Sequence, residues 1–153
     1  MKKRFYLAYG SNLNVDQMQN RCPTARIVGT ANLQGYELLF KGSKTGSYLT
    51  IEQKEGCLVP VAVWEVQPKD EARLDVYEGF PSFYYKKDIR ICMKSTETGR
   101  KRTVDAFAYI MHENRPIGVP RLWYVQTCLD GYDSFGFDRK YLFEAYRKSR
   151  RTK

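Results

Sequence analysis

Two short stretches of the sequence carry residue types from which an active site can be built. The first is Tyr9-Gly10-Ser11-Asn12-Leu13, between an aromatic and aliphatic run and a segment with helix-forming residues. Glycine permits close approach of a ligand to the backbone, and successive N–H groups at a helix entrance can bind an anion. Taken alone, the stretch fits both such a cradle and an ordinary capping turn.

The second stretch surrounds Glu78, an acidic residue at the end of an expected helix. Gly79 follows it, and aromatic residues stand on both sides, namely Tyr77, Phe80, Phe83, Tyr84 and Tyr85. A carboxylate near the negative end of a helix dipole is poorly stabilised there, and apolar burial would raise its pKa. Such a group suits general acid–base chemistry near neutral pH, while a solvated glutamate is the alternative.

Other catalytic patterns are incomplete in this chain. The stretch Lys41–Ser47 lacks the residue order of a phosphate loop, so we expect a flexible polar loop there. Ser11 lacks a nucleophile-elbow motif, and His112 is the sole histidine. The four cysteines, at positions 22, 57, 92 and 128, form no CxxC pair or zinc-ligand spacing. We therefore expect reduced thiols, no metal and no cofactor.

The net charge of +9 is concentrated at the two ends of the chain. Eight of the 26 basic residues lie in positions 2–4 and 147–153, which leaves 18 against 17 acids between them. A nearly neutral body without a basic stripe argues against a nucleic-acid-binding protein. No apolar run has the length of a membrane span and no signal peptide is apparent, so we expect a cytoplasmic protein. The sequence leaves the oligomeric state undetermined.

Strands and helices must hold the two stretches in place, and the sequence predicts a mixture of both. The expected strands are residues 4–9, 25–41, 50–53, 58–66, 83–93 and 102–111, with a turn at Lys54-Glu55-Gly56. The expected helices are residues 14–20, 68–78, 120–132 and 138–147. Without a steady βαβ rhythm, this order predicts a single α+β domain over residues 1–146, with a strongly bent mixed sheet or small β-barrel flanked by helices. A basic tail over residues 147–153 is expected to follow.

In combination and in this order, the motifs resemble the gamma-glutamyl cyclotransferase-like family, which includes gamma-glutamylamine cyclotransferases. The likeness covers most of the chain: YGSNL at residues 9–13, NLQGYELLF at 32–40, VAVWEV at 61–66, LDVYEGFPSFYY at 74–85, AFAYI at 106–110, and the late helix containing Tyr124.

The resemblance implies an enzyme that releases 5-oxoproline from a small gamma-glutamyl amide, the substrate's own α-amine attacking its γ-carbonyl. It implies Glu78 as the general acid and base. It also implies that the glutamyl group is bound by Tyr9, Gly10, Ser11, Asn12 and Leu13. By the same resemblance, Tyr85 matches an active-site tyrosine, and Tyr109 and Tyr124 are further candidates for substrate binding.

Two interpretations other than a small-amide cyclotransferase remain open at the level of the sequence. One is removal of a gamma-glutamyl group from a larger acceptor, because the loops that receive the leaving group cannot be interpreted. The other is a non-catalytic binding module of the same fold, whose basic ends meet an acidic partner or nucleic acid. Glu78 argues against a non-catalytic module, because the sequence keeps both the candidate acid and the Tyr9–Leu13 stretch.

Overall fold

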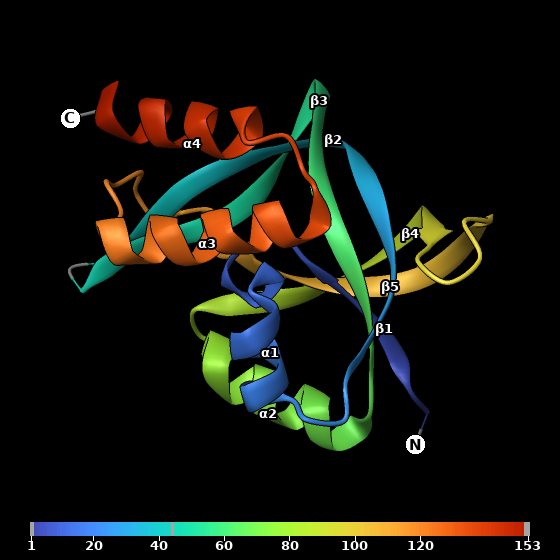
Figure 1. Ribbon diagram of the computed structural model, residues 1–153. Coiled ribbons are helices and arrows are strands. Elements are labelled where there is room, and N and C mark those ends of the chain that lie inside the picture. Colours follow the sequence, from blue (N-terminus) through green and yellow to red (C-terminus); the bar gives the residue numbers. More distant parts are fainter. Residues whose placement is uncertain (1, 44, 152–153) are drawn as a thin grey trace.

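Five strands close into a barrel in the computed structural model, which describes residues 2–43 and 45–151 (Figure 1). The order around the barrel is β1 (Arg4–Ala8), β3 (Gly46–Val66), β2 (Arg26–Ser43), β4 (Tyr84–Ser95) and β5 (Lys101–Met111). All neighbours are antiparallel except β1 and β5, which run parallel with Phe5 beside Ala106. The predicted α+β fold with a small mixed barrel is confirmed.

The described part of the chain also forms four α-helices, which surround this barrel. They are α1 (Val15–Arg21), α2 (Pro68–Glu78), α3 (Leu122–Phe135) and α4 (Lys140–Arg151). In Figure 1, α1 and α2 lie together at one end of the barrel, α3 crosses the chain that follows β1, and α4 lies against β2. None of the helices within the described ranges is long and apolar enough to cross a membrane.

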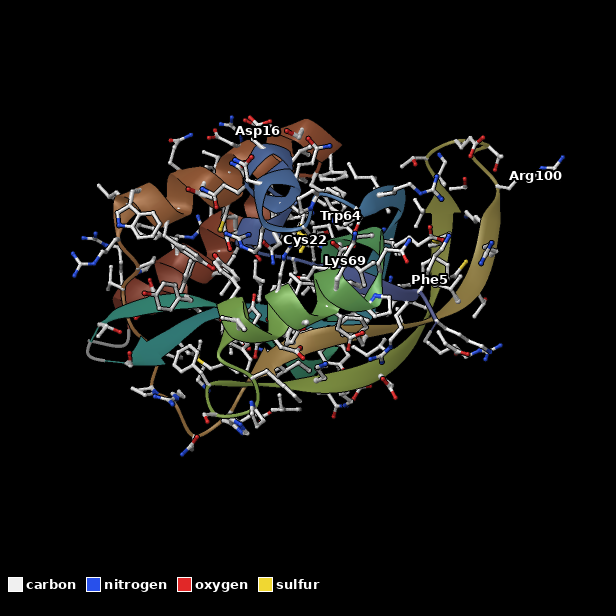
Figure 2. All side chains as sticks on the ribbon, turned by 90° about the horizontal axis from the view of Figure 1, so that it is seen from below. Phe5, Asp16, Cys22, Trp64, Lys69 and Arg100 are labelled. Atoms are coloured by element: carbon white, nitrogen blue, oxygen red, sulfur yellow. The ribbon has the colours of Figure 1, made fainter. Side chains whose placement is uncertain are left out.

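The core fills the space between the barrel strands and these helices. Trp64 of β3 and Cys22, directly after α1, are both fully buried. Figure 2 shows them in the interior, whereas Arg100 projects from the tip of the β4–β5 hairpin. Cys22 donates from Sγ to the carbonyl oxygen of Asp70 at 3.5 Å, which joins α1 to the first turn of α2.

Helix α2 has the ends that its sequence predicts. Gln67 and Asp70 form a capping box, and Pro68 occupies the first turn, where a missing N–H costs nothing. At the other end Gly79 adopts a left-handed conformation with φ of 64°, which stops the helix directly after Glu78. The residues at the two ends of α2 thus fix Glu78 as the last residue of the helix.

The expected turn at Lys54-Glu55-Gly56 was wrong. Strand β3 continues through it, and residues 54–57 form an irregularity opposite Gly35, between the pairs Gln34–Leu58 and Tyr36–Gln53. Both halves of β3 pair with the same strand β2, so the extra residues bulge from the ladder and the chain does not reverse.

The polar loop expected at residues 41–47 was also wrong in most of its length. Strand β2 reaches Ser43 and β3 starts at Gly46, while Lys44 lies outside the described residues. Lys41 is a buried strand residue that pairs with Glu52 and donates to the Glu113 carbonyl at 2.8 Å. The β2–β3 ladder extends to the pair Ser43–Gly46, so most of the expected loop is strand.

Helix α4 continues beyond the position where the sequence places its end. We expected a tail from residue 147, but the helix runs to Arg151, and Thr152 and Lys153 lie outside the described residues. Ser149 is buried, and Lys148 pairs with Glu37 of β2. These contacts with the barrel hold residues 147–151 in helical conformation.

Candidate active site

A pocket of about 470 Å³ opens where the chain after β1 meets the end of α2, the start of β4 and the start of α3. Aromatic and aliphatic side chains line it together with the titratable group of Glu78. Seven of the nine residues expected at the site line it: Tyr9, Gly10, Ser11, Asn12, Glu78, Tyr109 and Tyr124. The structure thus brings together two sequence stretches that lie more than sixty residues apart.

The chain after β1 forms a single turn of 3₁₀ helix, Ser11–Leu13. Together with Gly10 we call it the glutamyl loop, after the ligand that the sequence resemblance implies for it. Its internal bonds run from the N–H of Leu13 to the Gly10 carbonyl and from that of Asn14 to the Ser11 carbonyl, both at 3.0 Å. The N–H groups of Ser11 and Asn12 precede these bonds and have no partner within the turn. Ser11 and Asn12 both line the pocket.

Leu13 is not a lining residue, in contrast to the expectation. Its side chain is fully buried and packs against α3 at Gly131. A Cβ at Gly131 would stand 2.5 Å from the Leu13 Cβ and 2.8 Å from the Asn14 nitrogen. Gly131, which sequence reasoning missed, therefore lets α3 press directly on the glutamyl loop, and Leu13 anchors the loop to the core.

Glu78 is the one acidic residue that lines the pocket within the described ranges. Its carboxylate has no hydrogen bond or ion pair to any residue in 2–43 or 45–151. Burial raises the pKa of the Glu78 carboxyl from 4.5 to about 8, and the positive charge of Arg21 opposes this increase. A free carboxyl with this pKa exists in both protonation states near neutral pH.

Neutral tyrosine hydroxyl groups surround the Glu78 carboxyl. Burial raises the pKa of Tyr6, Tyr9, Tyr84 and Tyr124 well above the usual value, and the negative charge of Glu78 raises each further. They remain protonated and act as hydrogen-bonding groups, not as bases.

Two of these hydroxyls bind one strand residue and thereby fix the pocket wall. The Tyr124 hydroxyl accepts from the N–H of Leu49 at 3.0 Å, and the Tyr84 hydroxyl donates to the Leu49 carbonyl at 2.8 Å. Across the pocket, the Tyr9 hydroxyl donates to the carbonyl of Tyr109 at 2.6 Å. The wall therefore joins α3, β3, β4 and β5 to the chain after β1.

Tyr85, in contrast to Tyr84, is not among the residues that line the pocket. It lies on the opposite side of β4 from Tyr84, and its hydroxyl donates to Glu113. Successive side chains of a strand point to opposite faces, so an error of one position reverses the assignment. Tyr84, the preceding residue, lines the pocket instead.

Tyr109 lines the pocket, but its hydroxyl is not aimed at Glu78. It donates to Asp75 at 2.6 Å, and Asp75 in turn pairs with Lys86 at 2.9 Å. Asp75 lies three residues before Glu78 on α2, so this ion pair ties the last turn of the helix to β4 and β5. No local pattern in the sequence points to Asp75 or Lys86.

The residues that could hold a metal ion do not cluster in the described part of the chain. No group of three or more His, Cys, Asp or Glu side chains has a suitable arrangement there, and the cysteines are free thiols. The polar groups that line the pocket include the carboxyl of Glu78, the Ser11 hydroxyl, the Asn12 amide and several tyrosine hydroxyls.

The sequence matches the model of a known protein family over most of its length. The family model described as gamma-glutamyl cyclotransferase, AIG2-like, matches residues 6–126, a range that includes the glutamyl loop, Glu78 and Tyr124. The chain belongs to the gamma-glutamyl cyclotransferase, AIG2-like family. The family resemblance drawn from the sequence motifs is confirmed.

Individual gamma-glutamyl cyclotransferases resemble the chain at modest identity. The gamma-glutamylcyclotransferase of Homo sapiens is 31% identical over 119 residues, and that of Bos taurus is 32% identical over 118 residues. Each match covers 72% of this chain but only 62% of the relative's length. A solved gamma-glutamyl cyclotransferase structure aligns with a TM-score of 0.77 at 26% identity, over 94% of this chain and 86% of that one.

Proposed function

We propose that the protein is a gamma-glutamyl cyclotransferase that releases 5-oxoproline from a gamma-glutamyl amide. The observation that carries the proposal is Glu78, whose unpaired carboxyl with a pKa of about 8 lines the same pocket as the glutamyl loop. Family membership supports the reaction class, and the pocket volume of about 470 Å³ suits a small substrate.

In the proposed reaction, the Glu78 carboxylate first accepts a proton from the substrate's α-ammonium group. The free amine then attacks the γ-carbonyl carbon, a nitrogen–carbon bond closes the five-membered ring, and the carbonyl oxygen becomes an oxyanion. On collapse the bond to the leaving nitrogen breaks, and Glu78 returns its proton to that nitrogen. The ring nitrogen, which carries two protons after the attack, passes one of them through Glu78 to the departing amine, which leaves as an ammonium ion. An α-amine has a pKa of about 7.7–8.0, close to that of Glu78, so the first transfer costs little free energy.

The glutamyl loop supplies the electrostatic part of the mechanism in this proposal. The N–H groups of Ser11 and Asn12, unpaired within their turn, hold the glutamyl group or the oxyanion. One well-placed donor of this kind contributes about 3 kcal/mol to transition-state stabilisation. The backbone of the loop matters more than the Ser11 hydroxyl, which is bonded to Tyr77 at 2.9 Å.

The reaction needs no protein nucleophile because both reacting groups belong to the substrate. Well-oriented intramolecular reactions reach effective molarities of roughly 10⁵–10⁸ M, so correct folding of the substrate in the pocket provides much of the acceleration. Aromatic side chains at the rim, Tyr48, Phe83, Tyr84 and Trp123, would receive the leaving amine. Trp123 is 61% exposed and is available for contact with that group.

Incubation with a panel of gamma-glutamyl amides, amino acids and peptides tests the proposal, with 5-oxoproline detected by mass spectrometry. We expect release from at least one compound by the wild-type protein and loss of release in the Glu78→Gln variant. Absence of 5-oxoproline from the whole panel, together with salt-sensitive nucleic-acid binding, would instead favour the non-catalytic module.

A further inference from the structure

Arg21 is the last residue of α1 and contacts both the glutamyl loop and the end of α2. Its guanidinium lies 3.5 Å above the ring of Tyr77, the residue before Glu78. Its Nη1 group also donates to the side-chain oxygen of Asn12 in the glutamyl loop. A cation is stabilised at the C-terminal end of a helix, so α1 is a suitable element to present it.

Each of these two contacts is supported by a further hydrogen bond. The Asn12 amide, which accepts from Arg21, donates through Nδ2 to the Tyr6 hydroxyl at 2.9 Å. Tyr77, which lies under the guanidinium, has its hydroxyl 2.9 Å from the Ser11 hydroxyl. The glutamyl loop and the end of α2 are therefore connected twice, once directly and once through Arg21.

Arg21 also supplies the positive charge that acts on Glu78. The phenols of Tyr6 on β1, Tyr9 directly after it, Tyr84 on β4 and Tyr124 on α3 also face the Glu78 carboxyl, whose negative charge raises the pKa of each. Tyr77 on α2 lines the same pocket. Burial raises the pKa of Glu78, and the Arg21 charge lowers it. Besides Arg21, the charges of Asp70 and Arg73 on α2 act on Cys22, the residue directly after α1.

We propose that Arg21 is a positioning residue of this site, which holds the glutamyl loop against the end of α2 and keeps a positive charge beside Glu78. The catalytic part of this inference rests on the proposed function. Arg21 does not touch the reacting atoms; it acts through Asn12, Tyr77 and the carboxyl of Glu78. It sets both the spacing between loop and acid and the pH range in which the acid is ionised.

A matched pair of variants separates the charge of Arg21 from its shape. Arg21→Met keeps a long side chain without charge, and Arg21→Lys keeps the charge without the flat guanidinium. Arg90→Met removes a positive charge from an exposed pair with Asp105 on the β4–β5 hairpin and serves as the control. Thermal unfolding of each variant establishes that it is folded, and Arg21→Gln replaces Arg21→Met if the latter is not.

The first readout is the titration of Glu78 in the protein without substrate, followed by ¹³C NMR of labelled glutamate and assigned with Glu78→Gln. We expect Arg21→Met to move the Glu78 titration to higher pH, while Arg21→Lys and Arg90→Met leave it at the wild-type position. An unchanged titration in Arg21→Met would overturn the proposal. This readout needs no turnover, so it stands apart from the assay of 5-oxoproline release.

The second readout is the pH profile of kcat/KM for a substrate from the gamma-glutamyl panel. The acidic limb of this profile is the increase of kcat/KM with pH as Glu78 ionises, and in Arg21→Met it should move to higher pH. A shift of one pH unit lowers kcat/KM at pH 7 about tenfold. In Arg21→Lys the limb should stay in place while KM rises, because the contacts to Asn12 and Tyr77 are lost. A uniform decrease at all pH values in both variants, with the limb at its wild-type position, would indicate a purely structural role and contradict the proposal.

Discussion

The raised pKa of Glu78 predicts that this residue destabilises the folded protein at alkaline pH. A group whose pKa is higher in the folded than in the unfolded state contributes no penalty below its unfolded pKa of 4.5, and the penalty grows until the folded pKa of about 8 is passed. Integrating the difference in proton binding between the unfolded and folded states from pH 5 to pH 9 gives a loss of about 4 kcal/mol in unfolding free energy, if the carboxyl is fully buried. Glu78 lines an open pocket, where water screens part of this effect, so we expect about 2–4 kcal/mol.

The Glu78→Gln variant isolates this effect because all other titrating groups are unchanged. The variant should have nearly wild-type stability at pH 5 and exceed it at pH 9, by roughly 10 °C in Tm for a chain of this size. Urea and thermal unfolding of both proteins, followed by tryptophan fluorescence across this pH range, measure the difference. Parallel stability curves for the two proteins would refute the argument that burial raises the pKa of Glu78.

Three further predictions concern the walls of the pocket. Ser11→Leu should fill the cradle and raise KM at least tenfold; unchanged KM and kcat would count against the loop as the glutamyl site. Gly131→Ala places a Cβ 2.5 Å from that of Leu13, so we expect a loss of about 1–3 kcal/mol in unfolding free energy with reduced turnover; wild-type values of both would show that the loop tolerates displacement. Tyr85→Phe should leave turnover unchanged while Tyr84→Phe lowers it, and the reverse order would restore Tyr85 as the site residue.

Local signals in the sequence identified the acid and its helix. Pro68, the acidic residues after it and Gly79 act within a few positions of one another, and they define α2 and place Glu78 at its end. The glycine and small polar residues after a buried strand indicated a turn at the glutamyl loop, and the family resemblance assigned that turn to substrate binding. These features could be predicted because their physical causes are contained in short segments.

The errors arose where the outcome depends on partners distant in the sequence. Residues 54–57 bulge only because both halves of β3 pair with β2, and the choice between Tyr84 and Tyr85 depends on which face of β4 meets the pocket. The role of Arg21 follows from its contact with Tyr77, a residue 56 positions later. No periodicity or motif within a single segment contains that information.

Turnover of a gamma-glutamyl amide in H₂¹⁸O tests the central claim most directly. Intramolecular attack by the α-amine predicts 5-oxoproline without ¹⁸O from the wild-type protein and no product from Glu78→Gln. Glutamate carrying ¹⁸O would show that water is the nucleophile and contradict the cyclisation. Full 5-oxoproline release by Glu78→Gln would contradict the role of Glu78.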